Sequence, residues 1–285
     1  MSTPGADRYV DLHMHSTASD GARPPAEVVA AAAGAGLAAI ALTDHDTLAG
    51  IAEARAAGDR LGVRVVSGVE LSAVDAEGEE VHLLGLHLSR PEALERELAD
   101  FREARRDRAR RIVERLNALG IPVTLDAVLE QAAGGAVGRP HVARALVAGG
   151  WARDFRDAFD RLLGNGRPAF VEKRHLALAD AIRHVHEAGG IAVYAHPGAD
   201  ATRARLEAFR AIGLDGVEVR HPSHSAEDVA RIGALADHLG LLPSGGSDWH
   251  GASDGPRTIG SMRVPASWLD RQDARVRERA AQRVA

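Results

Sequence analysis

Residues 9–15, YVDLHMH, alternate apolar and polar side chains and set the first element of the fold. Successive side chains of a strand point to opposite faces, so the apolar residues share one face while His13 and His15 share the other. The chain continues through residues 16–20, STASD, to a further acid at Asp20. This stretch alone is compatible with a polar strand face or with a pair of metal ligands.

Similar apolar runs that end in polar groups recur along the chain and alternate with helical patterns. We expect about seven short strands, mostly separated by helices, which is typical of a parallel α/β sheet or barrel. In such folds, ligands bind where the carboxyl ends of the strands meet. The polar residues at or near the expected strand ends are His13, His15, Asp44, His45, Glu70, His82, His196, Glu218, Asp248 and His250.

The middle of the chain has a different pattern. Residues 94–119 have the apolar spacing of one long amphipathic helix, and we expect shorter helices at 124–133, 139–149 and 154–163 and no strand. The predicted organisation is therefore a barrel that a small helical domain interrupts. Its expected parts are the first part of the barrel at 7–92, the helical insertion at 93–171, the second part of the barrel at 172–270 and a C-terminal helical tail at 271–285.

The arginines between residues 102 and 115 are interleaved with glutamates and aspartates. This charge pattern favours a solvated, salt-bridged helix over a surface that binds nucleic acid.

The composition excludes several classes of protein. The chain has 285 residues and no cysteine, so it forms no disulfide, thiolate metal site or cysteine nucleophile. The formal net charge of −5 argues against a protein that coats nucleic acid. No stretch resembles a targeting segment or a membrane span, so we expect a cytoplasmic protein without a membrane partner.

Imidazoles and carboxylates without thiolates are a ligand set for Mn²⁺, Zn²⁺ or Fe²⁺. The candidate side chains are too numerous for a single ion. Their number fits a cluster of two or three ions that share a bridging carboxylate.

Six motifs occur in the order that is found in the PHP (polymerase and histidinol phosphatase) domain family, and the chain resembles that family from about Tyr9 to Gly251. The resemblance implies a distorted seven-stranded (β/α)7 barrel with a trinuclear metal site at the carboxyl ends of the strands. The motifs are DLHMHSTASDG at 11–21, LTDHDT at 42–47, SGVELS at 67–72, EEVHLLGL at 79–86, YAHPG at 194–198 and GGSDWHG at 245–251.

The resemblance also implies which residues hold each ion. We expect two to three divalent ions per chain, with Mn²⁺ first and Zn²⁺ or Fe²⁺ as alternatives. The implied ligands are His13, His15, Glu70 and Asp248 for the first ion, Glu70, His82 and His196 for the second, and Asp20, His45 and His250 for the third.

Three further segments resemble the bacterial branch of the family that contains 3′,5′-nucleoside bisphosphate phosphatase and the 5′-to-3′ exoribonuclease RNase AM. They are ASDG at 18–21, GGAVGRPHVARALV at 134–147 and GRPAFV at 166–171. The implied activity is removal of the 3′-phosphate from nucleoside 3′,5′-bisphosphates, digestion of short 5′-phosphorylated RNA from its 5′ end, or both. A hydroxide that bridges the ions would attack phosphorus, and no further catalytic side chain is expected.

The expected substrate is a nucleotide or a short RNA, with no DNA-binding module, and the chain is assumed to be a monomer. Arg139 and His141 are candidates for binding the second phosphate of a bisphosphate, because an arginine fork binds phosphate oxygens in pairs. Lys173, His221 and His224 are further candidates for substrate contact. The alternatives are that Arg139 only begins a helix and that Lys173 is a solvated surface residue.

Two other functions stay open at this point. A histidinol-phosphate phosphatase would share the barrel and the metals, but its pocket should offer an acid to the substrate amine. A metal-stabilised binding module or polymerase-accessory module would share the site without the activity.

Overall fold

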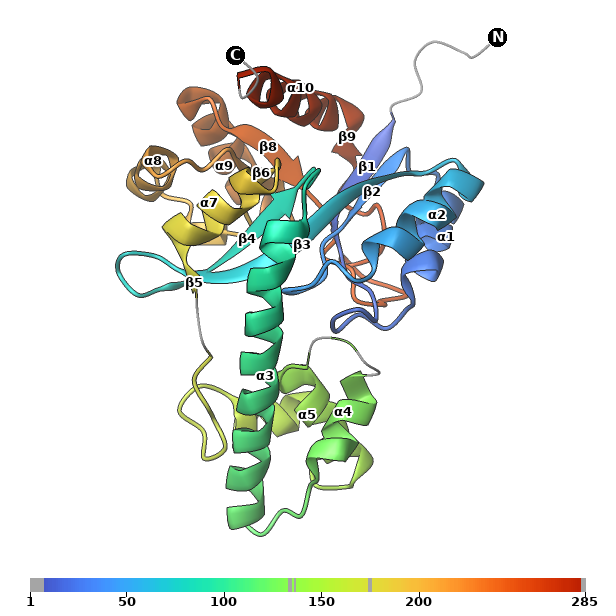
Figure 1. Cartoon of the computed structure of the whole chain (residues 1–285), viewed down its shortest axis with the longest axis vertical. Coiled ribbons are helices and arrows are strands. Elements are labelled where there is room, and N and C mark those ends of the chain that lie inside the picture. The colour runs from blue at the N-terminus through green and yellow to red at the C-terminus, as the bar shows by residue number, and fades with distance from the viewer. Residues whose placement is uncertain (1–7, 133–134, 136, 174–175, 283–285) are drawn as a thin grey trace.

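The computed structural model describes residues 8–132, 135, 137–173 and 176–282. Its central feature is a strongly curved sheet in which the strands follow the order β8-β7-β6-β4-β3-β2-β1-β9 (Figure 1). Within the described residues, seven strands have four or more residues, and they are β1 (Tyr9–Met14), β2 (Ala39–Leu42), β3 (Arg64–Val74), β4 (Glu80–Leu86), β6 (Ile191–Tyr194), β7 (Gly216–Arg220) and β8 (Leu242–Gly245). Two-residue strands, β5 (Leu176–Ala177) and β9 (Val264–Pro265), pair with β3 and β1.

The sheet closes into a barrel between β1 and the segment that follows β8. The Asp248 N–H donates to the carbonyl of His13 at 2.9 Å, and the His15 N–H donates to the carbonyl of Trp249 at 3.0 Å. An α/β barrel of about seven strands is therefore confirmed.

The expected parallel arrangement is wrong for β4. This strand runs antiparallel to both of its neighbours, β3 and β6. The reason is local, because β3 and β4 are joined by a short turn around Gly78, and adjacent strands with such a short connection can only form a hairpin.

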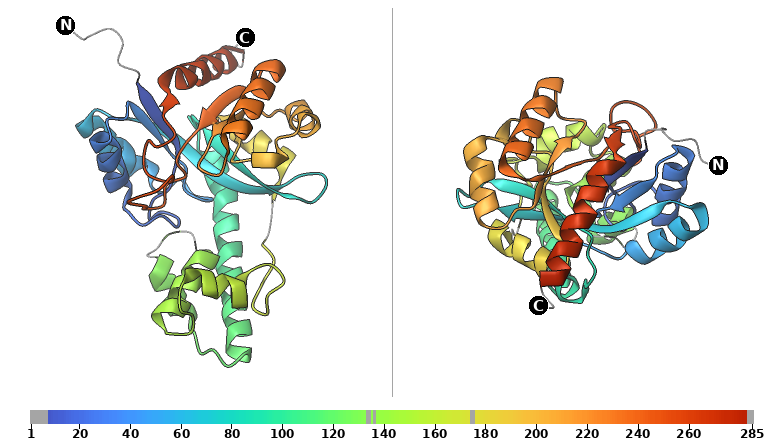
Figure 2. Two further views of the ribbon diagram at one scale, coloured as in Figure 1. Left: turned by 180° about the vertical axis from the view of Figure 1, so that it is seen from behind. Right: turned by 90° about the horizontal axis from the view of Figure 1, so that it is seen from above.

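Helices cover the outside of the barrel, and their ends match local signals in the sequence. The first helix, α1, begins at a proline (Pro25–Gly34), and α2 (Ile51–Leu61) ends at a glycine in the left-handed conformation. The others around the barrel are α7 (Leu178–Glu187), a short 3₁₀ helix η2 (Gly198–Asp200), α8 (Arg203–Ala211) and α9 (Ala226–Leu239). The last helix, α10 (Ala266–Gln282), crosses one end of the barrel, and the helices from the middle of the chain lie at the opposite end (Figure 2).

The middle of the chain forms a helical unit, by which we mean the described residues of 92–171. It contains α3 (Glu92–Ala118), α4 (Leu125–Ala132), α5 (Arg139–Ala148), α6 (Phe155–Ala158) and the π-helix η1 (Phe159–Leu163). The first turns of α3 pack on the barrel core through Leu94 and Leu98, whereas Ile112 and Leu116 belong to a separate core inside the helical unit. The expected division at residues 93 and 171 stays a proposal, since α3 contributes to both cores.

The helical unit and α10 lie at opposite ends of the barrel (Figure 1). In the part of the chain that the structure describes, no helix is both long enough and apolar enough to cross a membrane.

Candidate metal centre

The polar residues predicted from the strand ends gather at the end of the barrel that faces the helical unit. His13 and His15 are fully buried there, and they come from the last residues of β1 and the position directly after it. Three residues of the same rim, Asp46, His196 and Asp248, have positive φ angles of 49°, 33° and 50°. Non-glycine residues rarely adopt this conformation, and such strain concentrates at functional sites.

The Glu70 side chain, only 1% exposed, lies at the middle of the cluster. Its two oxygens face different sets of imidazoles. Oε2 lies 3.1 Å from His13 Nε2, 3.2 Å from His15 Nε2 and 3.3 Å from His45 Nδ1, whereas Oε1 lies 2.7 Å from His82 Nδ1 and 3.1 Å from His196 Nε2. A carboxylate in this position can bridge two ions, with one oxygen for each.

His82 reaches Glu70 from the amino end of its strand and not from the carboxyl end. The antiparallel direction of β4 places His82 opposite Ser72, near the carboxyl end of β3. His87, just past the other end of β4, points away from the centre and hydrogen-bonds the side chain of Gln272 on α10.

All nine residues for which the resemblance implied a ligand role lie in this cluster, and that role remains a proposal. Their nitrogen and oxygen atoms form groups in which the atoms lie within 4.8 Å of one another. The groups are His13, His15, Glu70 and Asp248; Glu70, His82 and His196; His15, Asp20, His45 and His250; and a fourth group of His13, Glu218 and His221.

A second observation also fits the binding of divalent cations. Both ring nitrogens of His15 and Nδ1 of His45 are buried without a hydrogen-bond partner in the described structure. Buried polar atoms are nearly always satisfied, so nitrogens without partners beside three carboxylates fit the coordination of a divalent cation.

The pKa values of His15 and His82 reflect the negative charge that surrounds these two imidazoles. Burial by itself would lower the pKa of His15, but the carboxylates of Asp248 and Glu70, 3.3 and 3.2 Å from its Nε2, outweigh the effect of burial and raise the pKa to about 10. For His82, the nearby Glu70 charge overcomes the effect of burial and raises the pKa to about 9. Protons on these rings take the place that a divalent cation would fill, and metal binding releases such protons.

Three acids that received no ligand role hold the cluster in place. Glu218 accepts from Nδ1 of His13 at 3.1 Å, which leaves Nε2 facing Glu70. Such a carboxylate orients a ligating imidazole and raises its basicity. Asp11 accepts from the N–H groups of Ser247 and Gly260, beside Asp248.

The third supporting acid, Asp44, holds the loop that leads to Asp20. It accepts hydrogen bonds from the N–H of Ser16, the hydroxyl of Ser16 and the hydroxyl of Ser19, each at 2.7 Å. Glu218 and Asp44 were noted at their strand ends, but sequence patterns do not separate an acid that orients a ligand from one that is a ligand.

The proposed substrate residues lie in different surroundings. His221 is buried, with Nε2 3.4 Å from an oxygen of Asp248, so it faces the centre. Both ring nitrogens of His224 are held by the main chain, by the carbonyl of Val219 and the N–H of Gly198. Because both nitrogens already have partners, His224 has little capacity for a substrate contact.

Arg139 begins α5, and its guanidinium packs against the rings of Phe159 and Phe170, 5.8 and 5.7 Å from their centroids. It also donates to the side chain of Asn165 at 3.1 Å. His141 is buried, and burial lowers its pKa to about 4, so this imidazole is neutral.

Lys173 lies beside the centre within a cluster of positive charges. Its ammonium donates to the hydroxyl of Ser72, and burial, together with Arg105, lowers its pKa to about 8. Arg108 shares these surroundings, and burial, together with Arg139 and Arg105, lowers its pKa to about 10.

The expectation of a solvated arginine-rich helix is therefore wrong for two positions of α3. The side chain of Arg105 is 12% exposed and binds Asp46, and Arg108 is buried and donates to the carbonyl of Val171. The acids between the arginines made the whole helix look solvated, because only the tertiary fold determines which face of α3 meets the barrel. Arg110 and Asp107 form the exposed pair that the pattern predicts.

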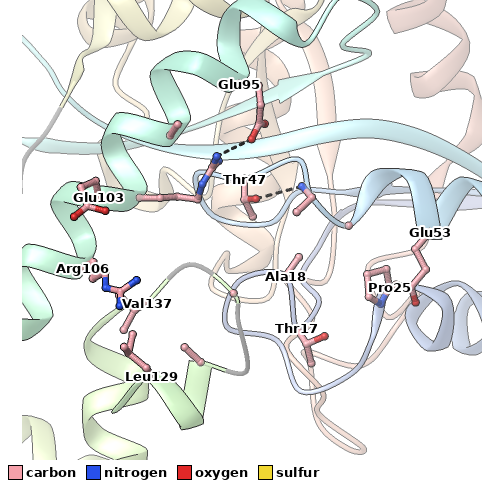
Figure 3. A pocket seen from close by; sticks show the side chains of 16 residues that line it. Thr17, Ala18, Pro25, Thr47, Glu53, Glu95, Glu103, Arg106, Leu129 and Val137 are labelled. Carbon is pink, nitrogen blue, oxygen red and sulfur yellow. Dashed lines mark hydrogen bonds and ion pairs between the residues drawn. The ribbon is translucent and has the colours of Figure 1, made fainter. Parts of the chain in front are cut away.

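A cleft of about 760 Å³ separates the rim of the barrel from the helical unit (Figure 3). On the barrel side, Thr17, Ala18 and Thr47 line it, from the two loops that carry Asp20 and His45. On the opposite side, Arg102 and Arg106 of α3 line it, and Arg102 pairs with Glu95 at 2.8 Å. The cleft therefore lies next to the loops of Asp20 and His45, and none of the nine proposed ligands lines it.

Known proteins resemble the chain over nearly its whole length. A 3′,5′-nucleoside bisphosphate phosphatase of Chromobacterium violaceum is 40% identical over 258 residues, which cover 88% of this chain and 90% of that protein. The 5′-3′ exoribonuclease Rnm of Escherichia coli is 39% identical over 248 residues, which cover 84% of each chain.

A solved structure also resembles the chain. A candidate metal-dependent phosphoesterase of Bifidobacterium adolescentis superposes with a TM-score of 0.86 and 34% identity, over 96% of this chain and 98% of that one. The model of the PHP domain matches residues 11–121. The described barrel, the imidazole and carboxylate centre at its rim and these likenesses agree, and the chain belongs to the PHP domain family.

Proposed function

We propose that this PHP-family hydrolase is a metal-dependent phosphoesterase that removes the 3′-phosphate of nucleoside 3′,5′-bisphosphates and digests short 5′-phosphorylated RNA from its 5′ end. The observation that carries the proposal is the position of the Arg105, Arg108 and Lys173 cations next to the cluster around Glu70. The names of the two curated relatives support the same substrates.

Two to three divalent ions, with Mn²⁺ first and Zn²⁺ or Fe²⁺ as alternatives, would activate water and neutralise charge on the phosphoryl oxygens. The nine imidazole and carboxylate side chains of the cluster would hold the ions. Glu70 would join two of the groups through its separate oxygens, and Glu218 would keep Nε2 of His13 directed at the centre.

The cation cluster would bind the phosphate that is not hydrolysed. Four cationic side chains, Arg105, Arg108, Arg139 and Lys173, interact there with the carboxylates of Asp46 and Glu80. Like charges in a half-buried site repel one another, so a phosphate dianion would stabilise this arrangement. A substrate with two phosphates can reach both the metal centre and this cluster.

The same cluster argues against a histidinol-phosphate phosphatase. That substrate has one phosphate and a positively charged amine, and the amine would meet cations where it needs an acid. A binding or polymerase-accessory module would bind the same ligands without turnover, so an activity assay separates it from an enzyme.

The test is a parallel assay of phosphate release and product identity. Adenosine 3′,5′-bisphosphate, a short 5′-phosphorylated RNA and histidinol phosphate are incubated with the Mn²⁺-loaded chain, and each incubation is repeated after chelation. We expect metal-dependent release of adenosine 5′-monophosphate, shortening of the RNA from its 5′ end and little attack on histidinol phosphate. Preferential hydrolysis of histidinol phosphate would reject the proposed substrates, and binding of all three without turnover would favour the binding module.

A further inference from the structure

The helical unit contributes no side chain to the four groups of potential ligands among the described residues. It nevertheless contacts two of the three loops that carry ligands of one group, the one formed by His15, Asp20, His45 and His250. We infer that the helical unit assembles this third ion site, with Arg144 and His141 as positioning residues for Asp20. The inference rests on the metal centre proposed above.

Arg144 of α5 holds the ligand residue itself. Its guanidinium donates from Nη2 to the main-chain carbonyl of Asp20 at 2.9 Å. A second close contact comes from Gly135, where a Cβ atom would lie 2.6 Å from the carbonyl oxygen of Thr17. The helical unit therefore fits tightly against the loop at both ends of residues 17–20.

His141 fixes the residue between these two contacts. Its Nδ1 accepts from the N–H of Gly138 at 2.9 Å, so the proton of this neutral ring lies on Nε2. The remaining nitrogen, Nε2, is then a donor, and the ring lies against the main chain of Ser19, next to Asp20. With Nδ1 held by Gly138 and a donor available beside Ser19, His141 is placed to support the loop.

The barrel holds the opposite side of this loop. Asp44 accepts hydrogen bonds from Ser16 and from the hydroxyl of Ser19, on the side of the loop that faces the barrel. The carboxylate of Asp20 extends from this clamped main chain to Nε2 of His250 at 3.2 Å and Nε2 of His45 at 3.9 Å. A displacement of the loop would separate these atoms.

The second ligand loop is held by α3. Arg105 donates to the carboxylate of Asp46 at 2.7 Å, and Arg102 donates to its carbonyl at 3.4 Å. Asp46 directly follows His45 and has a strained φ of 49°. Hence the helical unit restrains both Asp20 and His45.

The other three groups take their ligands from strands of the barrel and the loops that directly follow them. His13, Glu70 and His82 belong to strands of the sheet, so their positions are set by main-chain pairing. Loss of a contact from the helical unit should therefore affect one ion and leave the others in place.

The test compares Arg144→Met with wild type and with Arg144→Lys, which keeps a donor. The chains are loaded with Mn²⁺ and desalted, the metal content per chain is measured, and the affinity of each ion is obtained by titration. We expect Arg144→Met to lose one ion and to bind it about 10- to 100-fold more weakly, with partial recovery in Arg144→Lys. Arg156→Met is the matched control, because that side chain is 91% exposed.

A second pair of variants tests the same inference at His141. His141→Leu should lose the same ion, whereas His141→Gln retains a donor near the position of Nε2 and should keep it. Wild-type metal content and affinity in both Arg144→Met and His141→Leu would overturn the inference. A wild-type chain that binds no ion would instead contradict the metal centre itself, so the two failures are distinguishable.

Discussion

Oε1 of Glu70 lies 2.7 Å from Nδ1 of His82, on the neighbouring antiparallel strand. The hairpin between β3 and β4 produces this contact, and Oε2 of the same carboxylate faces His13 and His15. Glu70 thus connects the group that contains His82 with the group on β1.

The first prediction concerns this hairpin. His82→Ala should remove one ligand from the group of Glu70, His82 and His196, lower the metal content by about one ion per chain and reduce phosphate release. His87→Asn is the control, because His87 lies beyond the other end of β4 and asparagine tolerates its φ of 61°. Equal metal loss in both variants would show that general damage to β4 is responsible.

A second prediction concerns Gly246, in the loop before Asp248. A Cβ atom at this position would lie 2.4 Å from the main-chain nitrogen of His13, and few atoms there can move. Gly246→Ala should therefore destabilise the fold by about 1 to 3 kcal/mol and displace His13. Thermal unfolding and metal content measure the two effects, and Gly34→Ala, where a Cβ meets nothing within 4 Å, should lower neither the stability nor the metal content.

A third prediction is the pH dependence of substrate choice. Burial, with the nearby Arg105, lowers the pKa of Lys173 to about 8, so the ammonium is charged below that pH and neutral above it. The ratio of kcat/KM for a nucleoside bisphosphate to that for a monophosphate should fall as the pH rises through about 8.

Two variants check this assignment. Lys173→Met should have a low ratio at every pH, and Lys173→Arg should keep a high ratio at pH 9, because a guanidinium stays charged there. A decline in Lys173→Met as steep as in wild type would show that another group titrates.

A fourth prediction concerns the C-terminal helix. Asp215 is 2% exposed, and Arg279 of α10 donates to its two oxygens at 2.6 and 3.0 Å. Arg279→Met would leave a buried carboxylate with fewer partners and should lower the free energy of unfolding by about 2 kcal/mol, since the arginine itself is partly solvated. Arg277→Met, at an exposed position, should change it by less than about 0.5 kcal/mol, as denaturant titration can determine.

The sequence predicts the position of a site residue where that residue belongs to a regular apolar and polar alternation or lies at the end of a strand. Alternation in YVDLHMH places His13 and His15 on one face, and the structure agrees. The direction of β4 is not visible in its apolar pattern, since a strand has the same period in either direction. The short turn at Gly78 was the available signal for the hairpin.

The supporting contacts were less accessible from the sequence. Arg144 meets Asp20 across 124 positions, and Glu218 meets His13 across 205 positions. No local period relates such residues, because tertiary packing alone brings them together. The same reason applies to Arg105, whose burial depends on how α3 lies against the barrel.

The most direct test of the central claim is phosphate release from adenosine 3′,5′-bisphosphate by wild type and by Glu70→Gln, with the metal content of each chain measured in parallel. Glutamine has nearly the same shape but lacks the charge that two ions would share. We predict that wild-type activity disappears on chelation and returns with Mn²⁺, and that Glu70→Gln retains fewer ions and is at least about 100-fold slower, which corresponds to about 2.7 kcal/mol. A folded Glu70→Gln chain with wild-type metal content and rate would contradict the account.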